Sequence, residues 1–385
     1  MSTVRARVWR FRVDQGQTVV AKEVAQGDLP VGLARIVQIN AMACDLRKVL
    51  DYRTKQLEVR LLLSYLGVSK NGDLLRLDHR AFMASSRHIR GFVSECAGLG
   101  VLTATSEALF AWRDAQDPLH SFDALPSQLL RHYDTKGVRP DLLFHLPSGP
   151  VAGEARGRYR SPKVFLPVKP LAEQKERLRE LANWSVSHSD HAYFMSWVWI
   201  GQSGVAADVF LPEDGRWDDD LITDWANQDE RQEWRFPLPR NSSKQPAPVG
   251  ELPRGEKPDQ PHRVVDRLML RAAIAEEVLS PEDQAEEILD RLYASAPAVR
   301  GSKLGGIPVR GGWVRANALG PAQYEVLLGV LAERPPRPLD VRTRLMRAEG
   351  QFDACIDGRL LTVVRPVSAP RPQWRELEWV LFGDR

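Results

Sequence analysis

The stretch Arg139-Pro-Asp-Leu-Leu-Phe-His-Leu-Pro-Ser-Gly-Pro-Val-Ala-Gly-Glu-Ala-Arg-Gly-Arg158 decides the fold of this chain. It reads as two short strands joined by a turn, with Asp141 opening the first strand and Glu154 on the second. A hairpin return over these 13 positions brings the two carboxylates together. Two carboxylates beside a cationic side chain, here Arg156, form a site for a hard divalent cation, which prefers oxygen ligands. Such a metal polarises a phosphodiester and activates a water molecule.

These residues resemble the signature of the restriction-endonuclease-like superfamily, in which Pro-Asp is followed by Asp or Glu, any residue, and Lys. Pro140-Asp141 matches the first half, and Glu154-Ala-Arg156 matches the second half with Arg where the family has Lys. The family core continues into a helix and another strand. Here the pattern of residues 170–184 favours a helix, and that of 191–200 favours a strand.

The resemblance covers residues 125–201. It implies a central mixed sheet with flanking helices, and Mg²⁺ or Mn²⁺ held by Asp141 and Glu154. It also implies a nuclease that hydrolyses DNA, in a bacterial defence (antiviral) or mobile-element setting. Arg156 keeps its proton, so it cannot act as a base, but it can stabilise the negative charge of the transition state. The missing Lys therefore leaves two alternatives open: an active variant, or a nuclease fold that only binds DNA.

A basic run follows the motif. Strand periodicity places Glu154, Arg156 and Arg158 on one face, with small residues on the other. Arg158, Arg160 and Lys163 either bind nucleic-acid phosphates or belong to an ordinary charged strand and loop. On the expected helix, Gln174 and Lys175 either face the same site or are solvated; we name Lys175 as a further candidate contact to nucleic acid.

Length and composition favour two or three domains, because the chain has 385 residues and 43% of them are hydrophobic. No apolar run is long enough to span a membrane, so we expect no membrane partner. Three widely spaced cysteines form no zinc pattern, and the N-terminal residues lack the apolar core of a signal peptide. A reducing cytoplasm is the expected location.

We expect an α/β protein of three folded parts. These are an N-terminal α+β lobe (1–120), a central restriction-endonuclease-like domain (121–235) and a C-terminal α+β domain (263–385). Residues 236–262 are dense in Pro, Gly and polar residues, which predicts a linker.

Several smaller elements are expected outside the motif. The alternation of residues 4–13 predicts a half-buried strand. Residues 320–331 begin with Gly-Pro and are interpreted as a helix. Residues 341–365 alternate around the Asp-Gly at 357–358, which predicts a hairpin. The Gly-rich segment 300–313 lacks the spacing of a phosphate-binding loop, so it is either a surface loop or a nucleic-acid contact through Lys303, Arg310 and Trp313.

The leading interpretation is a Mg²⁺- or Mn²⁺-dependent endonuclease. One alternative is an inactive DNA-binding or scaffolding subunit of a larger complex, which the missing Lys and the unrecognised flanks favour. Another alternative is a protein-binding adaptor. DNA against RNA, the oligomeric state and any activating partner stay open at this point.

Overall fold

A computed structural model gives the structure of this chain. It describes residues 3–14, 17–43, 52–68, 75–110, 112, 119–122, 125, 129, 132–133, 138–146, 149–160, 166–201, 204–214, 216–217, 219–227, 281–316, 323–339, 341–348 and 351–383. Within these residues the chain is a mixed α/β protein with a large mixed sheet and several helices, as expected at that level.

The central sheet of the described chain has seven strands. In spatial order they are β2 (Val19–Pro30), β1 (Thr3–Val13), β9 (Gly204–Pro212), β8 (Tyr193–Gly201), β7 (Gly149–Tyr159), β6 (Leu142–Leu146) and β5 (Leu119–Ser121). The β5, β6 and β7 strands form an antiparallel meander, and β8 runs parallel to β7. A parallel neighbour requires a crossover, which is provided by α6 (Ala172–Ser187). The expected strand–helix–strand order after the motif is confirmed.

One face of this sheet packs against α4 (Arg87–Leu109), which begins after the N-cap Ser86. Small residues of β7 make this close approach feasible. A Cβ built on Gly157 would lie 1.7 Å from the backbone oxygen of Ser94, and one on Gly98 would lie 3.0 Å from the nitrogen of Gly157. Only small residues therefore fit on the face of β7 that packs against α4. The charged side chains of β7 lie on its other face, as the strand periodicity predicted.

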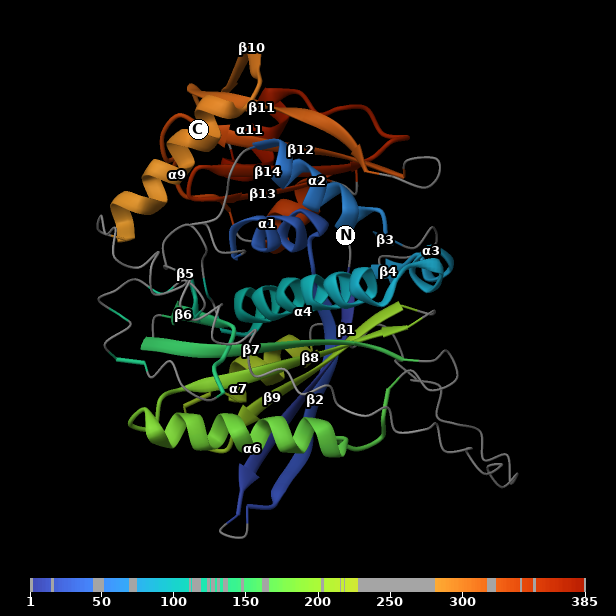
Figure 1. Cartoon of the computed structure of the whole chain (residues 1–385), viewed down its shortest axis with the longest axis vertical. Helices are drawn as coiled ribbons and strands as arrows, with labels where there is room; N and C mark the ends of the chain where they lie inside the picture. The colour runs from blue at the N-terminus through green and yellow to red at the C-terminus, as the bar shows by residue number, and fades with distance from the viewer. Residues whose placement is uncertain are drawn as a thin grey trace, which may run out of the picture.

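The opposite face of the sheet carries α6. Leu178 and Leu181 of this helix pack in one buried cluster with Trp197, Trp199 and other aromatic side chains of the strands. Figure 1 shows α4 on one side of the sheet and α6 on the other. Charged residues of β7 that point away from α4 therefore enter the space beside α6.

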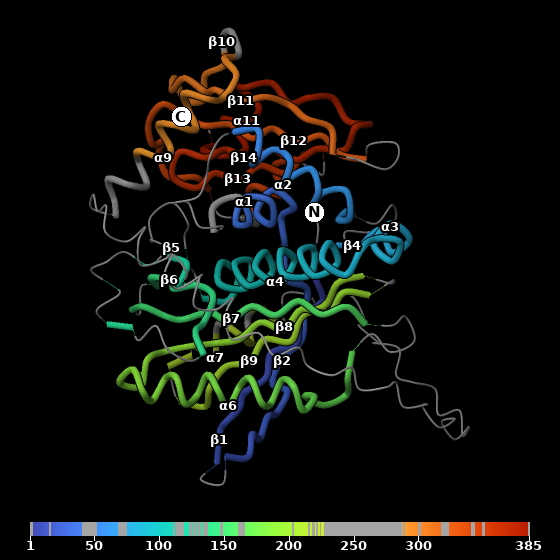
Figure 2. Tube along the Cα trace, viewed as in Figure 1, coloured from blue at the N-terminus to red at the C-terminus, as the bar shows by residue number. Residues whose placement is uncertain are grey.

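The N-terminal strands belong to the central sheet. β1 runs parallel to β9, from Arg5 opposite Ala206 to Phe11 opposite Pro212, and β2 pairs on its outer side. Figure 2 shows these two blue strands beside the green and yellow strands. Residues 1–120 were expected to form a separate lobe, but their strands β1 and β2 belong to the central sheet, because β1 pairs directly with β9. The expected half-buried strand is a largely buried one.

The C-terminal residues form a second sheet. Its five described strands are, in spatial order, β10 (Ala298–Leu304), β11 (Ile307–Ala316), β12 (Tyr324–Leu331), β14 (Leu360–Pro366) and β13 (Asp353–Asp357). All of its paired neighbours are antiparallel. Three further helices follow or precede these strands: α9 (Pro281–Ser295), α10 (Val341–Arg347) and α11 (Trp374–Phe382).

Helices from the first part of the chain lie between the two sheets. They are α1 (Leu33–Ala43) and α2 (Tyr52–Leu63), and Figure 1 shows them between the C-terminal sheet and α4. Val8 of β1, Ile36 of α1 and Val326 of β12 belong to one hydrophobic cluster. The two sheets therefore share a core through these helices. The remaining described elements are β3 (Leu66–Val68), β4 (Leu75–Leu77), α3 (His79–Ala84) and α7 (Asp219–Asn227).

The sequence-based expectations for the C-terminal part have mixed outcomes. Residues 324–331 form the strand β12, so the helix expected over 320–331 is wrong. The hairpin around Asp357-Gly358 is confirmed as β13–β14, with Gly358 at φ 52° in its turn, but residues 341–347 of the stretch in which it was expected form the helix α10. The Gly-rich segment 300–313 is largely the β10–β11 hairpin. The linker expected at 236–262 lies outside the described residues.

Candidate metal and phosphodiester site

Asp141 lies where β6 begins. Its backbone N–H donates to the carbonyl oxygen of Gly153 (3.0 Å), which ties it to the neighbouring strand β7. Its Oδ2 accepts a hydrogen bond from the backbone N–H of Ala155 (2.7 Å). Asp141 is therefore held against β7 by Gly153 and Ala155, the two residues that flank Glu154.

Glu154 is the buried carboxylate of this site, with 0% of its surface exposed. Its Oε1 accepts from the Nε of Arg177 (2.7 Å) and pairs with a terminal nitrogen of Arg156 (2.6 Å). None of the described residues donates a hydrogen bond to its Oε2. A buried carboxylate oxygen without a partner is costly, so Oε2 marks a position where a ligand would be stabilising.

The two carboxyl groups are electrostatically coupled. Burial, followed by the charge of Glu154, raises the pKa of Asp141 to about 7, against the opposing effects of the Ala155 N–H, Arg156 and Arg177. Burial likewise raises the pKa of Glu154, although its arginine partners oppose this. Burial is the largest cause of both shifts, because a desolvated carboxyl group is less stable in its charged form, and a bound cation would oppose it.

Arg156 projects to the same side of β7 as Glu154, as strand alternation predicted. About a third of its side chain is exposed, whereas Glu154 beneath it is fully buried. The guanidinium therefore lies between the buried carboxylate and solvent. This position suits a group that meets an incoming anion.

Arg177 of α6 is a site residue that the sequence reasoning missed. Its side chain donates to Glu154, to Glu180 (2.9 Å) and to the backbone oxygen of Arg139 (3.2 Å). The helix pattern predicts an apolar stripe but not which side of the helix faces the carboxylates, so the sequence contains no signal for Arg177.

Lys175 is exposed, and two helical positions turn the chain by about 200°, so it projects from another side of α6 than Arg177 does. The structure brings Arg177, not Lys175, to the carboxylates.

The basic run continues along β7. The guanidinium of Arg158 lies over the ring of Trp197 (5.5 Å to its centroid), and that of Arg160 lies over Trp199 (5.0 Å). Both arginines thus lie on the same face of β7 as Glu154 and Arg156. Lys163, the third residue of this run, lies outside the described residues.

A second buried acid on this face provides a contrast. Asp208 of β9 accepts from Arg7 (2.8 Å) and Trp9 (2.9 Å) at Oδ1. At Oδ2 it accepts from Trp199 (2.7 Å) and Gln174 (3.3 Å). Both of its oxygens are occupied, so Asp208 is a structural carboxylate. Gln174 is buried in this network and is neither solvated nor directed to Glu154.

The residues fit a hard divalent cation that keeps part of its water. Mg²⁺ is commonly bound through one or two carboxylates, with waters and substrate phosphates as the other ligands. Asp141 and Glu154 supply such a pair, and Oε2 of Glu154 is a buried acceptor without a donor. Among the described residues there is no group of three or more His, Cys, Asp or Glu placed to hold a metal, so an all-protein cage is not present there.

Arg310 and Trp313 of the Gly-rich segment contact different parts of the molecule. Arg310 donates to the backbone oxygens of Tyr293 and Ala294 and stacks on the Tyr293 ring, which ties it to α9. Trp313 instead belongs to a different arginine cluster, described below.

Comparisons with known proteins identify no relative. No protein-family model, no curated protein and no solved structure matches this chain. In the described part of the chain, no helix combines the length and apolarity needed to cross a membrane.

Proposed function

We propose that this chain is a metal-dependent phosphodiester hydrolase, with DNA as the favoured substrate, built on a restriction-endonuclease-like core. The element order supports this proposal: α4 is followed by the β5–β6–β7 meander, the crossover helix α6 and the parallel strand β8. The proposal is also supported by the sequence resemblance, because Asp141 directly precedes β6 and Glu154-Ala-Arg156 lies within β7, in the order of the acids and the cation of that signature.

One observation carries the proposal. Glu154 is fully buried, yet its Oε2 has no donor among the described residues, and Asp141 lies next to it with a pKa raised to about 7. A merely structural acid in the same sheet, Asp208, has donors on both oxygens. This difference fits a cation-binding function, because a bound cation would lower both pKa values and would interact with the buried Oε2 of Glu154, to which no described residue donates.

Each residue has a distinct role in this proposal. Asp141 and Glu154 would hold Mg²⁺ or Mn²⁺, which supplies Lewis-acid polarisation of the phosphate and an activated water. Arg156, at the solvent side of Glu154, stabilises the negative charge that develops on the phosphoryl oxygens. Arg177 fixes the orientation of Glu154 through Oε1 and leaves Oε2 available. Neither arginine acts as a base, because both keep their protons.

The test is a cleavage assay on plasmid and linear DNA with Mg²⁺ or Mn²⁺. The parent protein is expected to cut, EDTA to abolish cutting, and Glu154→Gln to abolish it with the metal present. Glu173→Gln, an exposed acid on α6, is the matched control and should cut like the parent. Cleavage by Glu154→Gln at the parental rate would remove Asp141 and Glu154 from the mechanism.

A second candidate function is a non-catalytic nucleic-acid-binding or scaffolding subunit. It is favoured by the absence of a Lys at position 156 and by the engagement of both arginines with the same oxygen of Glu154. A parent protein that cuts neither DNA nor RNA with either metal, yet binds DNA in a salt-dependent manner, would replace the enzyme by this function.

A further inference from the structure

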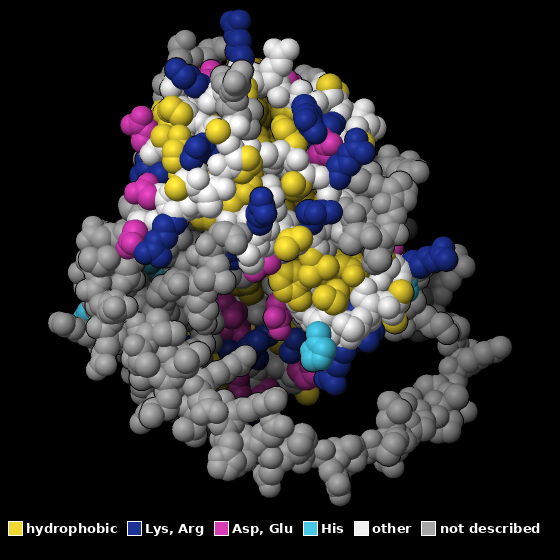
Figure 3. Space-filling model, turned by 45° about the horizontal axis from the view of Figure 1, so that its top comes forward, with side chains coloured by type: hydrophobic (Ala, Val, Ile, Leu, Met, Phe, Trp, Pro, Cys, Tyr) yellow, Lys and Arg dark blue, Asp and Glu magenta, His cyan; other side chains and the backbone are white. Residues whose placement is uncertain are grey.

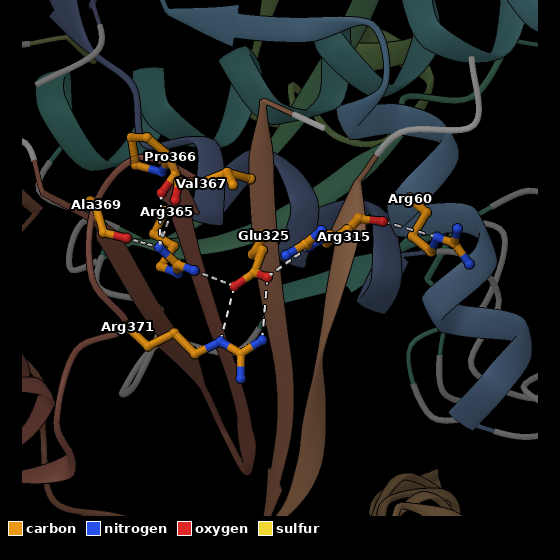
Figure 4. Close-up of polar contacts among 8 residues, drawn as sticks. All are labelled: Arg60, Arg315, Glu325, Arg365, Pro366, Val367, Ala369 and Arg371. Carbon is orange, nitrogen blue, oxygen red and sulfur yellow. Dashed lines mark hydrogen bonds and ion pairs between the residues drawn. The ribbon is translucent and has the colours of Figure 1, made fainter. Parts of the chain in front are cut away.

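A second cluster of charged residues lies on the C-terminal sheet, around Glu325 of β12. Arg371, between β14 and α11, donates to both of its oxygens, from Nε to Oε2 (2.9 Å) and from a terminal nitrogen to Oε1 (3.2 Å). Arg365 of β14 donates to Oε2, and Arg315 of β11 donates from Nε to Oε1 (3.3 Å). Figure 4 shows the three guanidinium groups converging on this one carboxylate.

The carboxylate at the centre is buried and stays ionised. Only 3% of the Glu325 side chain is exposed. The hydrogen bond from Arg371, with further ones from Arg365 and Arg315, lowers its pKa to about 2 despite the opposing effect of burial. The cluster therefore carries one negative and three positive charges at neutral pH.

One arginine already neutralises the glutamate. Arg365 is almost fully buried and also donates to the backbone oxygens of Pro366 (3.0 Å) and Ala369. It is thereby fixed as the structural partner of Glu325. The charges of Arg315 and Arg371 exceed what the buried carboxylate requires.

These two additional arginines face solvent. The side chain of Arg315 is 72% exposed and that of Arg371 is 53% exposed. Arg315 uses only Nε toward Glu325, and Figure 4 shows one terminal nitrogen of Arg371 directed away from the carboxylate. Both guanidinium groups therefore present N–H donors to the outside, although one end of each is fixed.

Two contacts restrict the motion of this pair. The Arg371 guanidinium lies over the ring of Trp313, 5.5 Å from its centroid. The Arg315 guanidinium is held on one side by its hydrogen bond to Glu325 (3.3 Å). Arg60 of α2, whose Nε donates to the backbone oxygen of Arg315 (3.1 Å), adds another arginine beside the pair. Arginines held in this way lose less side-chain entropy when a ligand binds.

We propose that Arg315 and Arg371 form a phosphate-binding site that engages the backbone of a nucleic acid. Two oriented guanidinium forks match the paired oxygens of phosphates, and a planar fork binds them bidentately. Arg60, bonded to the backbone of Arg315, lies beside the pair, and a third guanidinium group favours a chain of phosphates over a single anion. Figure 3 shows Lys and Arg side chains interspersed with acidic ones over the upper part of the molecule. This site lies on the C-terminal sheet, and its binding requires neither a metal nor cleavage.

The test is the binding of a short fluorescein-labelled oligonucleotide, followed by anisotropy in EDTA so that no metal-dependent binding or cutting contributes. Single-stranded DNA, duplex DNA and RNA are separate arms. Arg315→Ala/Arg371→Ala is expected to bind the preferred arm roughly 10- to 100-fold more weakly, and to lower the slope of log affinity against log salt by about 2. The control Arg12→Ala/Arg291→Ala removes two similarly exposed arginines elsewhere and should bind like the parent.

Far-ultraviolet circular dichroism and thermal unfolding establish that each variant is folded, and Arg315→Gln/Arg371→Gln provides a second pair with longer side chains. The proposal is overturned if both folded pairs bind every arm with the parental affinity and salt slope, or if the parent binds none of them at about 50 mM salt. It is also overturned if a poly-glutamate peptide, and no oligonucleotide, requires these arginines. Cleavage by Glu154→Gln is assayed separately, so failure of this site and failure of the proposed hydrolysis are distinguishable.

Discussion

The two ionic clusters of this molecule differ in how far the oxygens of their buried carboxylates are satisfied. At Asp141 and Glu154, two acids share two arginines, and the arginines contact only one oxygen of Glu154. At Glu325, three arginines share one acid, and the acid is saturated. Burial raises the pKa values of the first pair of acids, whereas arginine hydrogen bonds lower that of Glu325.

The hydrogen-bond partners of a buried carboxylate indicate whether a cation or an anion would bind next to it. A buried carboxylate oxygen that receives no hydrogen bond from the described residues, such as Oε2 of Glu154, suits a cation. At Glu325 both oxygens have donors, and the exposed guanidinium groups of Arg315 and Arg371 carry positive charge that this carboxylate does not neutralise. These groups therefore suit an anion. Asp208 is the balanced case, because each of its oxygens accepts two donors.

The largest expected effect concerns Arg156. Arg156→Ala should lower the cleavage rate by about 10²- to 10³-fold, because it removes a donor that stabilises transition-state charge. The variant should stay folded, since Arg177 still pairs with Glu154. Arg156→Lys should retain or raise activity if the position is catalytic. Unchanged cleavage by Arg156→Ala would show that its assigned role is wrong.

The next largest effect is on stability at the second cluster. Glu325→Gln should lower the free energy of unfolding by about 3 kcal/mol at pH 7, because it leaves the buried Arg365 without its counterion. The loss should shrink as the pH falls from about 4.5 toward 2, where the Glu325 of the parent is itself protonated and its folded-state advantage disappears. Urea unfolding across this pH range measures the loss of stability and its pH dependence. Glu287→Gln, which removes an acid from an exposed ion pair, is the control.

Asp141 should show the opposite pH dependence. Its pKa is raised from 3.8 to about 7, so its contribution to the free energy of unfolding is greatest below about pH 4 and is lost as the pH rises to about 7. In EDTA, Asp141→Asn should therefore gain stability relative to the parent over this interval. A difference between the two unfolding curves that is constant from pH 4 to 7 would contradict the raised pKa.

The smallest expected effect is on DNA affinity at β7. Neutralising Arg158, Arg160 and Lys163 together should weaken binding roughly tenfold and flatten its salt dependence, because phosphate contacts release counterions. Fluorescence anisotropy at several salt concentrations measures this change. Unchanged affinity and slope would show that nucleic acid does not use this face.

The part of the site that was predictable from sequence is the part formed by a local hairpin. Asp141, Glu154 and Arg156 lie within one short return of the chain, so strand periodicity alone places them on common faces. Arg177 reaches the site through a crossover helix, and a helix pattern does not determine how the helix is rotated over a sheet. The predicted roles of the site residues stay predictions.

The fold was less predictable where strands pair over long distances. The alternation in β1 indicates a strand but does not identify β9, about 200 positions later, as its parallel neighbour. The segment Tyr324-Glu-Val-Leu-Leu-Gly-Val-Leu331 is apolar almost throughout, and such short runs fit a buried strand or a buried helix equally. Because the segment was interpreted as a helix, the arginine cluster could not be predicted. Glu325 contacts Arg315 and Arg365 only because they lie opposite it on neighbouring strands.

The measurement that tests the central claim most directly is the binding of Mn²⁺, followed by electron paramagnetic resonance in the absence of nucleic acid. The parent is expected to bind Mn²⁺ at one site, and both Asp141→Asn and Glu154→Gln should weaken that binding by more than about tenfold. Glu325→Gln, which changes the saturated acid of the other cluster, should bind Mn²⁺ like the parent. Parental Mn²⁺ affinity in folded Asp141→Asn and Glu154→Gln would contradict the claim that these two carboxylates form a cation site.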